Sequence, residues 1–243
     1  MHMRPVTRFL PCGDTALTVE FGERVDRQLS ALVLALAARL SAAQVPGVVE
    51  AVATFRSLTV HYDPIALGQA ELKRRLEPML DGLEAAPDSG RVWRIPACYE
   101  ESLAPDLAEV AARTGLSAAQ VVERHSAVTY RVYMVGFLPG FPYLGDLPPE
   151  LALPRRENPR TAVPAGSIAI ATTLSAIYTL ESPGGWHVIG RTPAPLWDAG
   201  RDPPAVLGAG DKVVFEPVSL TEYEGLLAKA AAGALRMEPE AAA

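Results

Sequence analysis

The sequence predicts an α+β protein with two domains, and two observations carry this prediction. Within the first 95 residues, segments with strand and helix periodicity follow one another in the order strand, helix, strand, strand, helix, strand, which is the order of a ferredoxin-like, split βαβ unit. Between Pro139 and Pro217 lie 13 of the 22 prolines, and the apolar runs among them are short, which is typical of a compact β-barrel or sandwich. We therefore expect a ferredoxin-like domain over residues 1–95 and a β-rich domain with helices over residues 96–243.

Periodicity and helix breakers predict the elements of the first domain. Leu17, Val19 and Phe21 alternate with polar residues, which is the period of a half-buried strand. Asp26 suits the N-cap of a helix whose leucines fall on one face, and Pro46-Gly47 breaks that helix. The remaining expected elements are strands at residues 48–52, 55–62 and 91–95 and a helix at residues 70–83, which Pro78 kinks or shortens.

The second domain is expected to open with two short helices. One spans residues 105–115, and Ser117 with Gln120 forms a capping box for the next. Ser219 with Glu222 forms a capping box for a final helix. Strands are expected at residues 128–135, 167–171, 177–180, 187–190 and 212–216.

Composition argues against several classes of partner. The net charge is 22 − 28 = −6, and a nucleic-acid-binding face needs clustered positive charge. Three arginines, Arg155, Arg156 and Arg160, form the densest basic cluster, which is most often a solvated surface. The two cysteines, Cys12 and Cys98, lack the spacing of a disulfide framework or a metal site, so no metal is predicted in this chain.

The sequence also predicts where the protein resides. Its N-terminus has no apolar run of signal-peptide length. The longest aliphatic stretch, residues 29–40, is shorter than the roughly 20 residues that span a bilayer. We therefore expect a cytoplasmic protein that binds neither membrane nor nucleic acid.

The first candidate binding segment is the loop GFLPGFPYLG at Gly136–Gly145. Its prolines fix the backbone, its glycines relax it, and Phe137, Phe141 and Tyr143 supply aromatic surface. Such a loop loses little entropy on binding, so it can hold aromatic rings around a ligand. A stiff turn packed on the mouth of a barrel fits the same residues, and chemistry alone leaves both interpretations open.

The second candidate segment, ESPGGWH at Glu181–His187, combines a carboxylate, two glycines, an indole and an imidazole. The amides around Gly184-Gly185 could form a nest for a carboxylate or a phosphate. No Gly-rich Lys-Ser/Thr phosphate loop is present, so ATP binding by this chain alone is not expected. Ser182 lacks a nucleophile elbow, and a lone imidazole such as His187 is more often structural than catalytic.

Several charged residues are further candidates. Guanidinium groups pair with carboxylates through two hydrogen bonds, so Arg56, Arg160 and Arg191 could each bind an anion or form a surface salt bridge. Asp146 and Glu181 are possible general bases. His125 ends a helix, where a structural cation is favoured by the helix dipole.

Longer segments resemble a known family. GFLPGFPYLG, PRRENPRTAVPAGSIAI at Pro154–Ile170 and ESPGGWHVIGRTP at Glu181–Pro193 are similar to the C-terminal half of the KipI/PxpB family. That family comprises the B subunit of bacterial 5-oxoprolinase and the kinase inhibitor KipI, and it is also labelled allophanate hydrolase subunit one. The N-terminal half shows the same resemblance in GDTALTVEFG, PGVVEAVATFRSLTVHYDP and PDLAEVA.

The resemblance implies a cyclophilin-like β-barrel for the C-terminal domain and a set of partners. Members work with a homologous, cyclophilin-like C subunit and an amidohydrolase A subunit, and together they convert 5-oxo-L-proline to L-glutamate while ATP is hydrolysed. Phosphorylation of the lactam oxygen would make the amide carbon electrophilic enough for water, and this activation is ascribed to the B and C subunits together. ATP is therefore expected to be shared with a partner, and the chain to be inactive alone.

On this resemblance we expect the chain to be the B subunit of an ATP-dependent 5-oxoprolinase. The expected catalytic residues are Glu181, His187 and Asp146. The expected substrate-binding residues are Phe141, Tyr143, Arg160, Ser182, Gly184, Gly185, Trp186 and Arg191. The alternative is a KipI-type inhibitor that docks on a sensor histidine kinase and blocks its autophosphorylation. An allophanate hydrolase component is a third interpretation, but the chain lacks the Ser-Ser-Lys amidase signature.

Two segments depart from the family pattern. ATTLSA at Ala171–Ala176 stands where the family commonly has a glycine-rich turn with Gln-Thr-Gly, so an edge facing the ligand is altered. The run Ala97-Cys98-Tyr99-Glu100 stands where Val-Cys-Tyr-Gly is usual. We expect the change at Ala171–Ala176 to affect which substrate is bound, and the change at Ala97–Glu100 to affect packing.

Overall fold

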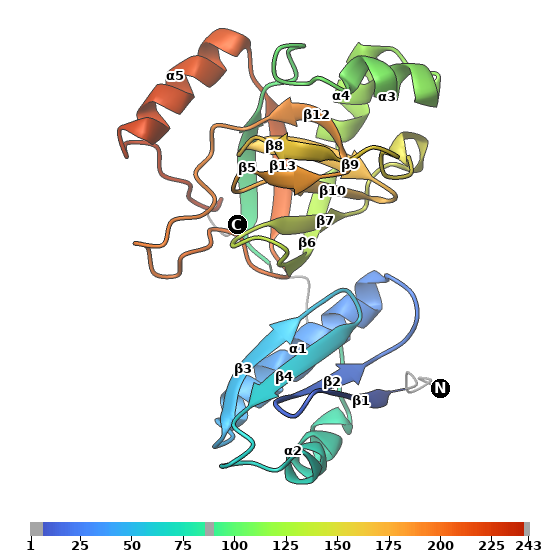
Figure 1. Cartoon of the computed structure of the whole chain (residues 1–243), viewed down its shortest axis with the longest axis vertical. Coiled ribbons are helices and arrows are strands. Elements are labelled where there is room, and N and C mark those ends of the chain that lie inside the picture. The colour runs from blue at the N-terminus through green and yellow to red at the C-terminus, as the bar shows by residue number, and fades with distance from the viewer. Residues whose placement is uncertain (1–6, 86–89, 241–243) are drawn as a thin grey trace. The chain divides into compact units, whose positions relative to one another are not determined.

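The computed structural model describes residues 7–85 and 90–240, and the chain divides into two compact units, residues 1–89 and 90–243 (Figure 1). Each unit has its own sheet and its own hydrophobic core. The predicted α+β class is confirmed. Within the described ranges, no helix has both the length and the apolar character needed to cross a membrane.

The first unit is a four-stranded antiparallel sheet with the strand order β1-β2-β4-β3. Asp26 caps the long helix of this unit by accepting hydrogen bonds from the amides of Gln28 and Leu29. The second helix ends before Pro78, which lies in a 3₁₀ turn. The elements are β1 (Arg8–Cys12), β2 (Ala16–Glu20), α1 (Arg27–Ala43), β3 (Val48–Ala53), β4 (Ser57–Tyr62), α2 (Gln69–Leu76) and η1 (Glu77–Leu80).

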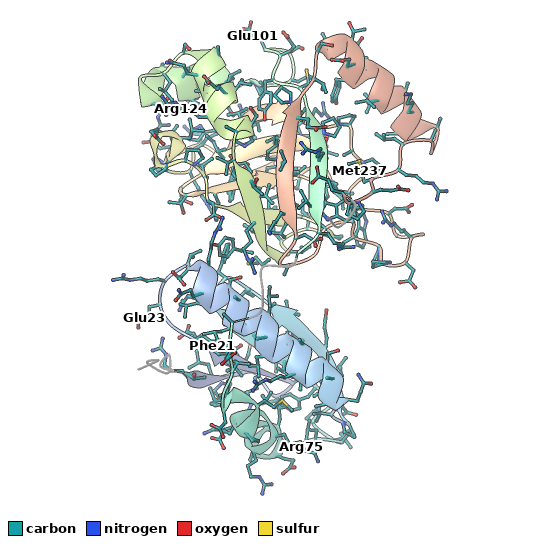
Figure 2. All side chains as sticks on the ribbon, turned by 180° about the vertical axis from the view of Figure 1, so that it is seen from behind. Phe21, Glu23, Arg75, Glu101, Arg124 and Met237 are labelled. Carbon is teal, nitrogen blue, oxygen red and sulfur yellow. The ribbon has the colours of Figure 1, made fainter. Side chains whose placement is uncertain are left out.

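The core of the first unit lies between its sheet and its helices. Leu17 and Val19 on β2 and Leu58 and Val60 on β4 are fully buried and pack with leucines of α1 and α2. Phe21 joins this core beside α1 (Figure 2). The alternation of these residues along both strands is the period that predicted the strands.

The sheet of the first unit has the ferredoxin-like order, but one edge strand differs from the prediction. The edge position beside β2 is taken by β1, from the start of the chain. The strand expected at residues 91–95 forms as β5 (Val92–Ala97), but it pairs in parallel with β13 (Lys212–Pro217) in the second unit. The prediction was wrong here because periodicity identifies a strand without identifying its neighbours.

The second unit is built on a seven-stranded sheet in the order β12-β9-β10-β7-β6-β13-β5. A separate antiparallel pair joins β8 (Arg160–Val163) and β11 (Ser182–Gly184). Both predicted capping boxes are present, at the helices α4 and α5. The other elements are α3 (Leu107–Thr114), α4 (Ala118–Ser126), β6 (Thr129–Val135), β7 (Pro142–Gly145), η2 (Pro149–Leu151), β9 (Ser167–Ala171), β10 (Leu174–Ile177), β12 (His187–Arg191) and α5 (Leu220–Ala231).

The two edges of this sheet meet and curl it into a barrel (Figure 1). Cys98, directly after β5, and Arg191, at the end of β12, exchange two backbone hydrogen bonds of 2.8 Å. Gly190 allows the approach, because a Cβ there would lie 2.9 Å from the carbonyl oxygen of Cys98. The β-barrel predicted for this domain is confirmed.

A buried histidine lies in the main core of the barrel. His125 has its Nδ1 2.9 Å from the hydroxyl of Tyr99 and its Nε2 2.9 Å from the hydroxyl of Ser175. Burial lowers the pKa of His125 to about 3, so the ring is neutral near pH 7. The cationic role expected from the helix terminus was wrong, because burial outweighs the helix dipole. Met237 also packs into this core, beside β5 (Figure 2).

Candidate functional site

One face of the barrel sheet carries small residues under a group of aromatic rings. Along β9 and β10, isoleucines point into the main core, whereas Ala169, Ala171 and Ala176 point to the opposite face. Alanine leaves room for rings, and Phe141, Tyr143, Tyr178 and Trp186 occupy that room. We call these four residues the aromatic site. Three of them were predicted from the two candidate segments, and Tyr178 was not.

The rings of the aromatic site pack edge to face. Phe141 is central, with its centroid 5.0 Å from Tyr143, 5.2 Å from Tyr178 and 6.4 Å from Trp186. Tyr143 lies 6.0 Å from Trp186. T-shaped pairs of this kind add stability beyond the area they bury, so the site is a rigid apolar wall.

The loop before β7 holds an exposed ring at the edge of this wall. Phe137 has a φ of 72°, a left-handed conformation that is unusual for a bulky residue. Its ring is 62% exposed yet lies 5.4 Å from Phe141. Thr179 donates a hydrogen bond to the carbonyl of Pro139 and ties the loop to the end of β10. A strained backbone that exposes an aromatic ring is typical of a binding loop.

Arg155 lies close to the aromatic site and supplies a positive charge there. Its guanidinium carbon is 5.9 Å from the centroid of Trp186, within the range of a cation–π contact. Burial raises the pKa of both Tyr143 and Tyr178, and Arg155 opposes that rise. Both phenols are therefore protonated near pH 7.

A buried carboxylate next to the aromatic site engages the other two arginines of the predicted basic cluster. Asp106 accepts hydrogen bonds of 2.8 and 2.6 Å from Arg160, 2.8 Å from Arg156 and 2.7 Å from the amide of Val188. The hydrogen bond to Asp106 raises the pKa of Arg160. Since the paired donors of Arg160 are already engaged, this residue holds the fold together instead of facing a ligand anion.

His187 lies against the same network and is fully buried. Its Nε2 is 3.0 Å from the carbonyl oxygen of Pro154, and a carbonyl can only accept, so Nε2 carries the proton. Its Nδ1 has no hydrogen-bond partner among the described residues and lies 3.8 Å from a carboxylate oxygen of Glu109. His187 is therefore a buried imidazole held in a fixed orientation, with its Nδ1 toward Glu109.

The expected nest at Gly184-Gly185 is absent from the structure. Gly184 ends the extended strand β11, and neither glycine has a left-handed φ, although a nest needs alternating right- and left-handed residues. Gly184 is required for a different reason, because a Cβ at this position would lie 2.2 Å from the hydroxyl oxygen of Tyr178. Gly185 has ordinary space, with Pro159 3.6 Å away. The prediction of a nest was wrong because it rested on composition alone.

The remaining predicted residues do not gather at one point. Glu181 is exposed directly before β11, and Ser182 is buried in that strand. Asp146 lies near Tyr130 in the main core. Arg191 bonds to the carbonyl of Ala165 and lines a cavity under α5. A further candidate, Arg56, belongs to the first unit and pairs with Glu20.

Sequence reasoning missed Asp106, Glu109, Arg155 and Tyr178 as parts of the site. Asp106 was interpreted as part of a helix start, but its side chain makes no capping bond to α3 and turns to the arginines instead. The sequence held no signal of this role, because Asp106 with Glu109 three residues later has the pattern of an ordinary helix start. In the described ranges no group of three or more His, Cys, Asp or Glu residues is arranged to hold a metal ion.

Similarity to known proteins identifies the family to which this chain belongs. Residues 7–207 match a family model described as carboxyltransferase domain, subdomain C and D. The chain is 37% identical to the B subunit of 5-oxoprolinase from Bacillus subtilis, over 87% of this chain and 92% of that protein. It is 43% identical to the B subunit of 5-oxoprolinase from Escherichia coli O157:H7, over 84% of this chain and 93% of that protein. The chain therefore belongs to the family of 5-oxoprolinase B subunits within the carboxyltransferase C and D subdomain group, which confirms the resemblance found in its motifs.

A solved structure supports the fold. The crystal structure of TTHA0988 superposes with a TM-score of 0.75 at 39% identity and covers 84% of this chain. This chain spans only 40% of the TTHA0988 chain. The same architecture therefore also occurs as part of a longer polypeptide.

Proposed function

We propose that this chain is the B subunit of an ATP-dependent 5-oxoprolinase and converts 5-oxo-L-proline to L-glutamate together with a C-type and an A-type subunit. The observation that carries the proposal is the similarity to two 5-oxoprolinase B subunits, which covers at least 84% of this chain. Because the matching family model covers residues 7–207, the similarity includes both units and is not confined to one motif.

The aromatic site is the ligand-binding surface in this proposal. Phe141, Tyr143 and Trp186 form its wall, the protonated phenol of Tyr178 donates to an oxygen of the ligand, and Arg155 takes the anion-binding role first expected of Arg160. Gly184 and Ser182 keep the backbone close to Tyr178.

ATP is shared with a partner subunit in this proposal, and the chain is inactive alone. A triphosphate needs several converging cationic or amide donors. Arg156 and Arg160 are neutralised by Asp106 and Glu109, which leaves Arg155 as the arginine near the aromatic site without such a partner among the described contacts. The remaining donors would come from the cyclophilin-like C-type subunit.

The three candidate catalytic residues have different access to a ligand. Glu181 is exposed, so it can exchange a proton with a bound molecule or water. His187 is buried and acts through Glu109. Asp146 lies toward the main core, which makes it the weakest of the three candidates. Cytoplasmic residence follows from the consumption of ATP and suits the two free cysteines, Cys12 and Cys98.

The test is reconstitution. The chain is co-purified with the C-type and A-type subunits, and phosphate release that depends on 5-oxo-L-proline is followed with and without each of them. We expect activity only with all three, and a loss of at least about tenfold in Arg155→Gln, with Arg201→Gln as an exposed control. A soluble three-subunit complex without activity would overturn the proposal, and capture of a histidine kinase by the chain would then support the inhibitor alternative.

A further inference from the structure

A second cavity, distinct from the aromatic site, lies between the barrel and helix α5. Its volume is about 300 Å³, at the lower end of the range for small-molecule sites. We call it the α5 cavity. Tyr223 and Leu227, one helical turn apart on α5, form one side, and the segment after β12 forms another. Leu227 is 46% exposed, so solvent reaches the cavity on that side.

The α5 cavity is lined by one cation. Among the described residues that line it, Arg191 is the only charged one, and the others are apolar, aromatic, glycine or threonine. Its Nε donates a hydrogen bond of 2.9 Å to the carbonyl oxygen of Ala165, which orients the guanidinium and leaves its two terminal nitrogens for a ligand. No acidic side chain in the described ranges pairs with Arg191, in contrast to the pairing of Arg160 with Asp106.

Arg191 has little freedom to turn away. Its backbone is fixed by two hydrogen bonds to Cys98 where the barrel edges meet. Tyr223 is 4% exposed, and Arg191 opposes the rise that burial causes in the pKa of its phenol. Because no carboxylate among the described residues offsets the charge of Arg191, its guanidinium is available to bind an anion. The arrangement therefore favours a bound anion.

The walls restrict the anion to a compact one. Leu196, Trp197 and Pro193 line the cavity and suit a small ring with one carboxylate, whereas a triphosphate would need more than one cation. Tyr178 lines the α5 cavity and also belongs to the aromatic site, so the two sites share one residue.

We propose that the α5 cavity binds the substrate 5-oxo-L-proline, with the carboxylate of the lactam held by both terminal nitrogens of Arg191. This assignment rests on the proposed function, since that function supplies the identity of the lactam. Arg191 then binds the carboxylate of the lactam in the α5 cavity, whereas Arg155 binds a different ligand group at the aromatic site. Sequence reasoning had placed Arg191 in one site with the aromatic residues.

The first experiment needs no change to Arg191. The fluorescence of Trp197, which lines the cavity, is followed while the full chain, and then the three-subunit complex, is titrated with 5-oxo-L-proline or with 2-pyrrolidone, the same lactam without a carboxylate. The Trp197→Phe variant shows how much of the fluorescence change comes from Trp197. We expect saturable binding of 5-oxo-L-proline and at least about tenfold weaker binding of 2-pyrrolidone. Equal affinities, or no binding to either preparation, would overturn the assignment.

The second experiment uses variants in the complex. Arg191→Gln should raise KM for 5-oxo-L-proline at least about tenfold and change kcat by less than about threefold, because the carboxylate is held equally in the ground and transition states. Arg191→Lys should fall between Arg191→Gln and the wild type, and the exposed Arg201→Gln should match the wild type. An unchanged KM in a folded, active Arg191→Gln complex would overturn the site while leaving the proposed function intact. A wild-type complex without turnover would contradict the function, and the titrations would still decide the site.

Discussion

A single buried carboxylate, that of Asp106, sets the role of the arginines near the aromatic site. It engages Arg156 and Arg160 and also accepts the amide hydrogen of Val188 on β12. These contacts join the start of α3, the strand β8 and the strand β12. Arg155, the neighbouring residue in the sequence, is left to face Trp186.

Asp106→Asn should lower the free energy of unfolding of the second unit by about 3–5 kcal/mol, because it leaves the partly buried Arg160 without a counter-charge and Arg156 with only the more exposed Glu109. Unfolding in urea is followed by tryptophan fluorescence, since Trp93, Trp186 and Trp197 all lie in the second unit. The control is Glu109→Gln, which also removes a partner of Arg156 but at a 43% exposed side chain, and it should cost no more than about 1 kcal/mol. Equal losses in the two variants would contradict the central role of Asp106.

His125 should make the second unit less stable in mild acid. The pKa of His125 is about 3 in the folded chain and about 6.5 in an unfolded one, so the unfolded state binds more protons between these values. Stability is full above about pH 6.5 and falls as the pH drops toward 3. At pH 5 the free energy of unfolding should be about 2 kcal/mol lower than at pH 7.5.

The matched control for this pH effect is His125→Gln, whose amide can bond to Tyr99 and Ser175 but does not titrate. Urea unfolding of the wild type and the variant is compared at pH 5, 6, 6.5 and 7.5. The slope between pH 5 and 6.5 should disappear in the variant. An identical slope in both proteins would show that other groups cause it.

At the scale of elements, the β9–β10 hairpin carries the departure from the family pattern. Ala171 pairs with Leu174, so Thr172 and Thr173 form a two-residue turn. Thr172 has a φ of 54°, a left-handed conformation that glycine adopts readily and a β-branched residue does not. The glycine-rich turn usual in the family would relieve this strain. Ala171 and Ala176, which lie on either side of this turn, pack under the aromatic site.

Thr172→Gly should therefore raise the free energy of unfolding by about 0.5–1 kcal/mol, the difference between the relieved strain and the flexibility that glycine adds to the unfolded chain. Thr173→Gly is the control, because Thr173 has no left-handed φ, and it should be destabilising. Urea midpoints from tryptophan fluorescence give both values. A loss of stability in Thr172→Gly would show that the turn is not strained.

At the scale of the whole molecule, the division at residues 89 and 90 assigns β5 to the barrel. Trp93, Ile95 and Ala97 of this strand are buried in the main core. A fragment of residues 90–243 should unfold cooperatively, whereas residues 96–243 should not, because β13 would lose its parallel neighbour. Circular dichroism during thermal unfolding distinguishes the two. Equal stability of the fragments would place the boundary at residue 95, as the sequence first suggested.

Much of the fold could be predicted, but less of the candidate site. Asp26, the two capping boxes and the alternation of Leu17 with Val19 are local signals, and each predicted its element correctly. The neighbours of β5 and β1 were not predictable, because pairing partners far apart in the sequence leave no local trace. Asp106 and Arg160 are 54 residues apart, and no local pattern in either segment reveals their ion pair.

The sequence by itself determined the elements, the class and the family, because hydrophobic periods, caps, turns and long motifs are local properties of the chain. Tertiary structure alone decided that Arg160 is bound to Asp106, that Gly184 makes room for Tyr178, and that Arg191 faces a cavity apart from the aromatic site. The physical reason is that a charge or a backbone group acts through what surrounds it in space. Closing the barrel brings distant strands together, and this closure sets the contacts of the candidate residues in the second unit.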